Sequence, residues 1–315
     1  MKKHVRNFLI LTTLTTATIY GINKIISVTS IMKNLLKTDH GHFFNWKYGK
    51  IYYTKTGKGS PVLLIHDLEP SSSSAEWDKI SRSLSKKHTV YAIDLLGCGR
   101  SEKPNLTYTN YMYVQLITDF IKKVIHEKTS LVSTGASGSF SIMACNMEPV
   151  YFDKIILINP EKLSDLSRTP DKTRNALKFL IDMPIIGTFI YNILYSNIFI
   201  EKLFSEKYYS NTHITDTNTT ETYYEAAHLE NSKGKYLFSS ICANYTNINI
   251  AHALEKINNS IYLICSKENA YSESIIDSYS EYNPSIESVY VEHSKYLPQM
   301  ETPDQLLQHI ELFLE

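Results

Sequence analysis

Residues 89–104 read TVYAIDLLGCGRSEKP, a short apolar run followed by a loop with two glycines. Thr89–Ile93 has the length of one strand, and its apolar side chains do not alternate with polar ones. This pattern is typical of a parallel strand covered on both faces. Gly97 and Gly99 permit a tight turn after it, and Arg100 and Ser101 offer polar side chains that can fix the loop. The segment predicts a buried strand that ends in a rigid loop.

Similar apolar runs lie on both sides of this segment and alternate with helical patterns. The expected strands are Val62–Ile65, Thr89–Ile93, Ser130–Val132, Lys154–Ile158, Ser260–Ile264 and Ser285–Val291, and the expected helices are Trp77–Leu84, Tyr111–His126, Phe140–Asn146 and the closing Thr302–Leu314. This βαβ order predicts an α/β fold with a doubly wound, mostly parallel sheet. A strand pair at Phe43–Tyr48 and Lys50–Thr56, turned at Gly49, opens the domain.

The strand rhythm stops at Pro160 and resumes at Ser260. Helical apolar spacing instead marks four stretches in between: Asn175–Met183, Ile190–Phe204, Glu221–Leu229 and Tyr236–Ala243. We therefore expect a helical lid inserted into one domain. The expected division is an anchor helix and linker at 1–37, the first part of the core at 38–160, the lid at 161–250 and the second part of the core at 251–315.

Composition excludes several classes of function. The chain has 32 basic and 32 acidic residues among 315, so no overall charge favours nucleic acid as a partner. The four cysteines (Cys98, Cys145, Cys242 and Cys265) are far apart and form no CxxC pair, which argues against a zinc site or a disulfide scaffold. The sequence contains no phosphate-binding glycine loop or dinucleotide fingerprint. We expect no metal and no cofactor.

The N-terminus has the pattern of a membrane-associating helix. Lys2, Lys3 and Arg6 precede the uncharged stretch Phe8–Ile22, which is shorter than the ~20 residues of a typical span. If Lys24 extends toward the headgroups, the helix can continue to Val28 and cross at a tilt. Without an A-x-A cleavage pattern we expect an uncleaved anchor, with a cleaved export signal as the alternative. Basic residues on both sides leave its orientation open.

Three segments carry a resemblance to a known family. They are HD at His66–Asp67, DLLGCGRSEKP at Asp94–Pro104 and LPQMETP at Leu297–Pro303. Over about residues 45–315 the chain resembles the α/β-hydrolase superfamily, in particular its lid-bearing esterase, epoxide-hydrolase and haloperoxidase-like members. The resemblance implies a serine–acid–histidine triad at the carboxyl ends of the strands and a lid that sets specificity. YYEAAHL at Tyr223–Leu229 is similar to part of such lids.

The same resemblance indicates that the triad positions hold other residues. The family places its nucleophile on a sharp turn, between small residues two before and two after it. In SLVSTGASGSFSIMAC, Ser133 and Ser137 take the small positions and Gly135 takes that of the nucleophile. Tyr296 stands where the family has histidine, directly before LPQMETP, and Asn269 stands where it has the acid. The resemblance therefore implies an inactive site.

An alternative shifts the alignment by two residues. Ser137 would then be the nucleophile between Gly135 and Ser139, with His293 as the base and Glu268 or Glu161 orienting it.

The family's oxyanion hole uses backbone N–H groups, here those of Ala136 and of the loop after His66. Asp67 replaces the usual glycine in that loop and would repel an oxyanion. His66 itself is a candidate base, or a residue that braces the loop.

Three functions remain open at this stage. The first is a membrane-associated, non-catalytic hydrolase homologue that binds a small apolar ligand or a protein partner. The alternative is an active serine hydrolase of esterase or lipase type, acting on an ester-like substrate through Ser137 and His293. The third is cofactor-free chemistry without the nucleophile, against which the replacement of histidine by Tyr296 counts.

Overall fold

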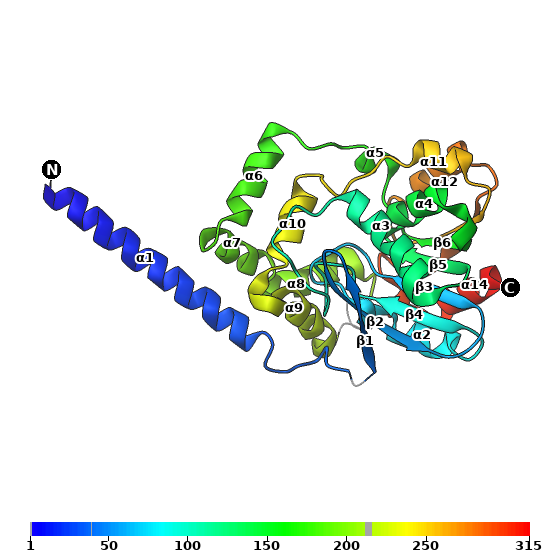
Figure 1. The fold of residues 1–315 in the computed structure, drawn as a ribbon, viewed down its shortest axis with the longest axis horizontal. Helices are drawn as coiled ribbons and strands as arrows, with labels where there is room; N and C mark the ends of the chain where they lie inside the picture. The colour runs from blue at the N-terminus through cyan, green and yellow to red at the C-terminus, as the bar shows by residue number, and fades with distance from the viewer. Residues whose placement is uncertain (1, 39, 212–215) are drawn as a thin grey trace.

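The computed structural model describes residues 2–38, 40–211 and 216–315 and contains one eight-stranded sheet (Figure 1). The strands are β1 (Gly41–Trp46), β2 (Gly49–Thr56), β3 (Pro61–Ile65), β4 (Thr89–Ile93), β5 (Thr129–Thr134), β6 (Phe152–Ile158), β7 (Ser260–Ser266) and β8 (Glu287–Val291). Their order is β1-β2-β4-β3-β5-β6-β7-β8, with β1, β2 and β4 paired antiparallel and every other pair parallel. The predicted α/β sheet is confirmed.

Apolar side chains cover both faces of the central strands, which explains why their sequences are apolar without alternation. On β6, Ile155 and Leu157 belong to one buried cluster, whereas Ile156 and Ile158 belong to the other. The first face is covered by α3 (Asn110–Phe120), α4 (Ser137–Met147), α11 (Ala251–Lys256) and α12 (Ser272–Tyr282). The second is covered by α2 (Asp78–Leu84) and α14 (Pro303–Leu314). The sheet is therefore doubly wound.

Six α-helices lie between β6 and α11, and all but the first of them lie on the side of the sheet toward the N-terminal helix (Figure 1). They are α5 (Leu163–Leu166), α6 (Lys172–Asp182), α7 (Ile186–Leu194), α8 (Asn197–Leu203), α9 (Thr217–Ser232) and α10 (Lys235–Cys242). The helix expected at Ile190–Phe204 is thus two helices, which a non-helical residue, Ser196, separates. Asp171 and Asp216 cap α6 and α9 by accepting backbone N–H groups. We call α5–α10 the inserted helices.

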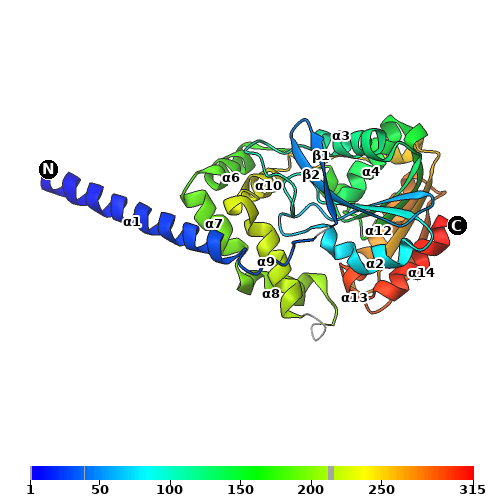
Figure 2. The same cartoon turned by 60° about the horizontal axis from the view of Figure 1, so that its bottom comes forward.

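The N-terminal helix α1 (Lys2–Thr29) projects from the rest of the molecule (Figures 1 and 2). Within it, His4–Thr29 is 26 residues long and apolar enough to cross a membrane, and the most apolar part is 6% buried. At about 1.5 Å per residue its length exceeds the thickness of a hydrocarbon core. The helix extends beyond the uncharged stretch Phe8–Ile22 and continues through Lys24, whose ammonium group reaches the side chain of Asn231.

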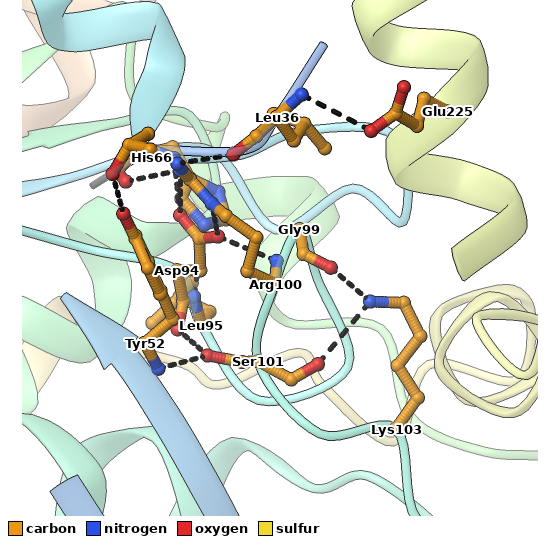
Figure 3. Close-up of polar contacts among 12 residues, drawn as sticks. Leu36, Tyr52, His66, Asp94, Leu95, Gly99, Arg100, Ser101, Lys103 and Glu225 are labelled. Carbon is orange, nitrogen blue, oxygen red and sulfur yellow. Dashed lines mark hydrogen bonds and ion pairs between the residues drawn. The ribbon is translucent and has the colours of Figure 1, made fainter. Parts of the chain in front are cut away.

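The linker after α1 is fixed to both the core and the inserted helices (Figure 3). The backbone N–H groups of Leu35 and Leu36 donate to the buried carboxylate of Glu225 on α9, at 2.8 and 3.1 Å. Arg100, in the loop after β4, donates to the carbonyl oxygen of Leu36 at 3.3 Å. The direction in which α1 leaves the domain is therefore set by buried polar contacts.

Candidate functional site

The loop after β4 forms the rigid support of the site (Figure 3). Asp94 is fully buried and accepts hydrogen bonds from the backbone N–H of Ser74 and from the backbone and guanidinium of Arg100, over 2.6–3.0 Å. Burial alone would raise the pKa of Asp94, but the charge and hydrogen bonds of Arg100 outweigh it and bring the pKa to about 2. A Cβ at Gly99 would lie 2.3 Å from this carboxylate, so the loop requires glycine there.

His66 connects this loop to the one after β3. Its Nε2 accepts the backbone N–H of Leu95 at 3.0 Å, so the ring proton lies on Nδ1 and is donated to the carbonyl oxygen of Asp67 at 2.6 Å. Burial lowers the pKa of His66, which keeps the ring neutral. Both nitrogens are thus engaged with the backbone, as expected of a bracing residue rather than a base.

Gly135 occupies the turn between β5, which ends at Thr134, and α4, which begins at Ser137. Its φ of 55° lies in the left-handed region, and its N–H donates to the carbonyl oxygen of Ile158 on the neighbouring strand. A sharp strand-to-helix turn of this kind is where the family carries its nucleophile. The side chain at the tip of this turn is absent.

The carboxylate of Asp67 occupies the space above this turn. Its Oδ1 accepts the backbone N–H groups of Leu68 and Ala136, both at 2.8 Å. These are the two N–H groups that the resemblance to hydrolases predicts as oxyanion donors: one in the loop after β3 and one on the residue after the predicted nucleophile position. A Cβ at Gly135 would lie 2.3 Å from this oxygen. Asp67 can therefore adopt this position only because residue 135 is glycine.

Tyr296 completes the arrangement from the loop after β8. Its hydroxyl donates to Oδ2 of Asp67 at 2.8 Å, and its ring stacks on that of Tyr208. Burial and, next, the charge of Asp67 raise the pKa of Tyr296 well above its ordinary value. Tyr296 is therefore a protonated donor at neutral pH and not a base. Asn159 holds this loop in place by donating to the carbonyl oxygen of Tyr296 at 2.9 Å.

Two adjoining cavities open at the carboxyl ends of the strands. One has a volume of about 490 Å³ and is lined in part by Asn269 and Tyr296, and the other, of about 240 Å³, is lined in part by Asp67 and Ala136. Three residues line both cavities: Glu161, Asp165 and Lys207. This edge of an open α/β sheet is where ligands usually bind. The shared lining is charged.

The family model described as "Alpha/beta hydrolase family" matches residues 62–309. The chain belongs to the alpha/beta hydrolase family. A curated relative, the 2-hydroxy-6-oxo-6-(2'-aminophenyl)hexa-2,4-dienoic acid hydrolase of Metapseudomonas resinovorans, is 34% identical over 89 residues, which is 28% of this chain and 31% of the relative. The chain thus aligns with only about a third of the length of the curated relatives that it matches.

Solved structures of other family members share the fold. A serine hydrolase involved in carbazole degradation, the CarC enzyme, has a TM-score of 0.71 at 17% identity. The likeness covers 87% of this chain and 98% of the CarC chain. A membrane phospholipase A, described as a bacterial virulence factor, has a TM-score of 0.70 at 18% identity. That likeness covers 100% of this chain and 98% of the phospholipase.

Of the three residues predicted at the triad positions, Gly135 and Tyr296 lie on either side of Asp67. The Asn269 side chain has a different hydrogen-bond partner. Asn269 follows β7, and its side-chain oxygen accepts the N–H of Tyr271 at 3.2 Å. It also lines the larger cavity together with Tyr296. Among the described contacts, none joins the Asn269 side chain to Tyr296, so the two do not form an acid–base pair.

The residues of the alternative triad are not brought together. Ser137 is fully buried at the start of α4, and its hydroxyl donates to the carbonyl oxygen of His66 at 2.6 Å. His293 and Glu268 are exposed, and no described hydrogen bond connects either side chain to Ser137. Glu161 lines both cavities, and burial raises its pKa, with Asp67 contributing next.

Three contributors to the site were not singled out by the sequence: Asn159, Glu69 and Lys207. Asn159 has a φ of 42°, a conformation that asparagine tolerates better than most residues, and it directly precedes Pro160. Glu69 accepts a hydrogen bond from the hydroxyl of Tyr195 on the inserted segment. Lys207 lies 4.6 Å from the ring centre of Tyr296. Of these three residues, only Asn159 had a signal in the sequence, namely the asparagine–proline pair that follows a strand.

Glu76 is a buried carboxyl group whose ionisation makes the stability of the fold depend on pH. It is 3% exposed, and Gln299 donates to its Oε2 at 3.1 Å. Burial raises its pKa from 4.5 to about 7. The folded chain therefore keeps this proton between pH 4.5 and 7 while the unfolded chain loses it, so stability falls as pH rises through this window.

We predict that Glu76→Gln removes this dependence. Relative to the variant, the unmodified chain should lose at most about 3 kcal/mol of unfolding free energy between pH 4.5 and 7.5. Unfolding midpoints measured across this range in detergent check it, with Glu287→Gln on the exposed edge of β8 as the control. Parallel pH curves for the unmodified chain and Glu76→Gln would contradict the prediction.

Proposed function

We propose that this chain is a membrane-associated α/β-hydrolase homologue that binds a ligand without hydrolysing it. One observation carries the proposal: the carboxylate of Asp67 accepts the hydrogen bonds of Ala136, Leu68 and Tyr296 at the place where a hydrolase stabilises its oxyanion. A fixed negative charge in that position opposes the development of a second one during acyl transfer.

The absence of a nucleophile also argues against hydrolysis by this chain. Loss of the serine from a triad enzyme typically lowers kcat by about a millionfold. In this chain Gly135 has no side chain at the turn, and the hydroxyl of Ser137 is buried and donates to His66. The carboxylate of Asp67, bonded to Tyr296, lies where a side chain at residue 135 would begin. Restoring activity would therefore require several coordinated changes.

The two cavities are the proposed binding site, and the inserted helices are its proposed lid. The smaller cavity is lined by Asp67 and also by four residues of the inserted segment: Leu166, Arg168, Ile241 and Asn244. Because Glu161, Asp165 and Lys207 line both cavities, a ligand with a polar head fits this lining better than a purely apolar one. A protein partner is the alternative occupant.

The helix α1 is the proposed membrane anchor. Its length and apolar composition suffice for a span, and its apolar side chains from Phe8 to Leu14 are more than half exposed. The likeness to a membrane phospholipase A over the whole chain supports this assignment.

Ester hydrolysis tests the proposal. We expect the detergent-solubilised full chain to hydrolyse p-nitrophenyl esters of short and long acyl chains no faster than its Ser137→Ala variant, because that hydroxyl does not reach the cavities. A rate that is well above background and disappears in Ser137→Ala would instead establish the active esterase with Ser137 as nucleophile.

A further inference from the structure

The bend between α6 and α7 lies alongside the apolar helix α1 (Figure 2). Asn23 of α1 donates to the carbonyl oxygen of Ile185 at 3.0 Å and accepts from the amide of Asn192 on α7 at 3.0 Å. Both asparagine side chains are buried. Their hydrogen bonds fix the bend at the level of Asn23.

The contact extends toward the N-terminus of α1. Ile185 shares a shallow cleft with Thr12, Thr13, Thr16, Ala17 and Tyr20. From Thr12 to Asn23 an α-helix rises about 16 Å. The bend therefore lies beside the middle of the helix that is apolar enough to cross a membrane.

This part of the inserted helices exposes apolar side chains. The α6–α7 face, as we define it, consists of Leu177, Phe179, Leu180, Ile186, Ile193 and Leu194, which are 38–71% exposed. From Met183 to Ile200 the sequence contains no charged residue and no histidine. The helices α6 and α7 cross at 98° and, taken together, also pass the length and hydropathy criteria for a broken span. Large apolar side chains exposed together on neighbouring helices are typical of an interaction surface.

We infer that the α6–α7 face inserts into the membrane interface beside α1, so that the domain contacts lipid through two elements. The inference rests on the proposed membrane association of α1. With α1 in a bilayer, the Asn23–Ile185 and Asn23–Asn192 hydrogen bonds hold the face at the lipid surface. An apolar helical face in this position buries itself among headgroups and the first acyl carbons.

The membrane-facing segment is also connected to the candidate site. Helix α8 follows α7 and continues into Phe204–Tyr208, a segment that carries Lys207. Lys207 lines both cavities. A shift of the inserted helices at the lipid surface would therefore change the lining of the proposed binding site.

Quenching of tryptophan fluorescence by brominated lipid tests this inference. The full chain is reconstituted in phosphatidylcholine–phosphatidylglycerol vesicles, with or without dibrominated acyl chains, and the buried Trp46 and Trp77 provide the background. Ile186→Trp and Phe179→Trp report the α6–α7 face, and Leu11→Trp reports α1. Val150→Trp is the control, because Val150 is 71% exposed in a segment at the start of β6, away from the carboxyl edge.

We expect brominated lipid to lower the added emission of Leu11→Trp and Ile186→Trp about twofold or more and to leave that of Val150→Trp unchanged. If the emission of Leu11→Trp is quenched but that of Ile186→Trp and Phe179→Trp is not, the inference is overturned and the anchor remains supported. The α6–α7 face would then be covered by another occupant, such as a second copy of the chain. No quenching of Leu11→Trp would refute the membrane association itself, and the inference with it. Equal quenching of Val150→Trp would also overturn the inference, because the contact would then be nonspecific.

Discussion

Replacement of Gly135 by serine, the residue that a hydrolase would carry, is expected to destabilise this protein rather than activate it. The new Cβ would lie 2.3 Å from Oδ1 and 2.4 Å from Cγ of Asp67. The carboxylate would have to leave the N–H groups of Leu68 and Ala136 and the hydroxyl of Tyr296. Loss of these charge-assisted hydrogen bonds and the positive φ of residue 135 together cost about 3 kcal/mol or more.

The double variant Asp67→Gly/Gly135→Ser should recover a substantial part of this loss. Removing the carboxylate relieves the clash, so the two substitutions are expected to be coupled by about 2 kcal/mol in favour of the pair. Unfolding midpoints of both single variants and the double variant measure the coupling. At this chain length we expect Gly135→Ser alone to lower the midpoint by roughly 5 °C or more.

The matched control for this cycle is Gly21→Ser, because a Cβ at Gly21 meets no atom within 4 Å. Its midpoint should remain within about 1 °C of that of the unmodified chain. Additive effects of Asp67→Gly and Gly135→Ser would contradict the account, since they would mean that the two side chains do not compete for the same space.

Arg100→Met is the second substitution with a large expected effect. It leaves Asp94 buried without its partner and removes the contact of Arg100 with the carbonyl oxygen of Leu36. Breaking a buried ion pair from one side typically costs about 3–5 kcal/mol. The surface pair of Arg168 and Asp165 is the matched control, because the Arg168 side chain is 59% exposed. Arg168→Met should cost less than about 1 kcal/mol.

The pH dependence of the Arg100→Met effect provides an independent check. The pKa of Asp94 is lowered from 3.8 to about 2, so the pair contributes its full stability above pH 3.8 and loses it as the pH falls through 2. Chemical unfolding should therefore separate the two arginine variants clearly at pH 7, and their difference should shrink as the pH falls from 3.8 toward 2. Equal losses for Arg100→Met and Arg168→Met would show that the buried pair does not stabilise the loop.

The sequence was sufficient for the sheet because its strands are short, apolar and buried on both faces. Thr89–Ile93 is β4 without any change of bounds, and β3 begins one residue before the expected Val62. The inserted helices were harder to predict. A period of apolar residues continues from Ile190 to Phe204, and only the backbone conformations of Tyr195 and Ser196 separate α7 from α8. Such a local break has no strong sequence signal.

The candidate site could be predicted only in part, because it depends on three distant segments. The sequence indicated that Asp67, Gly135 and Tyr296 depart from the family pattern, each judged separately. It could not indicate that they contact one another, since the side-chain position of Asp67 depends on the space left by Gly135 and the donor supplied by Tyr296. The orientation of Ser137 toward His66 is equally a property of the folded chain.

The most direct test of the account is covalent labelling of the full chain by a fluorophosphonate, read by intact mass. Such a probe requires a nucleophile next to free oxyanion donors, and here the donors Leu68 and Ala136 are bonded to Asp67. The account predicts a folded protein of unchanged mass after incubation, whether or not Ser137 is replaced by alanine. A stoichiometric adduct that is absent in Ser137→Ala would contradict it and establish a working serine hydrolase.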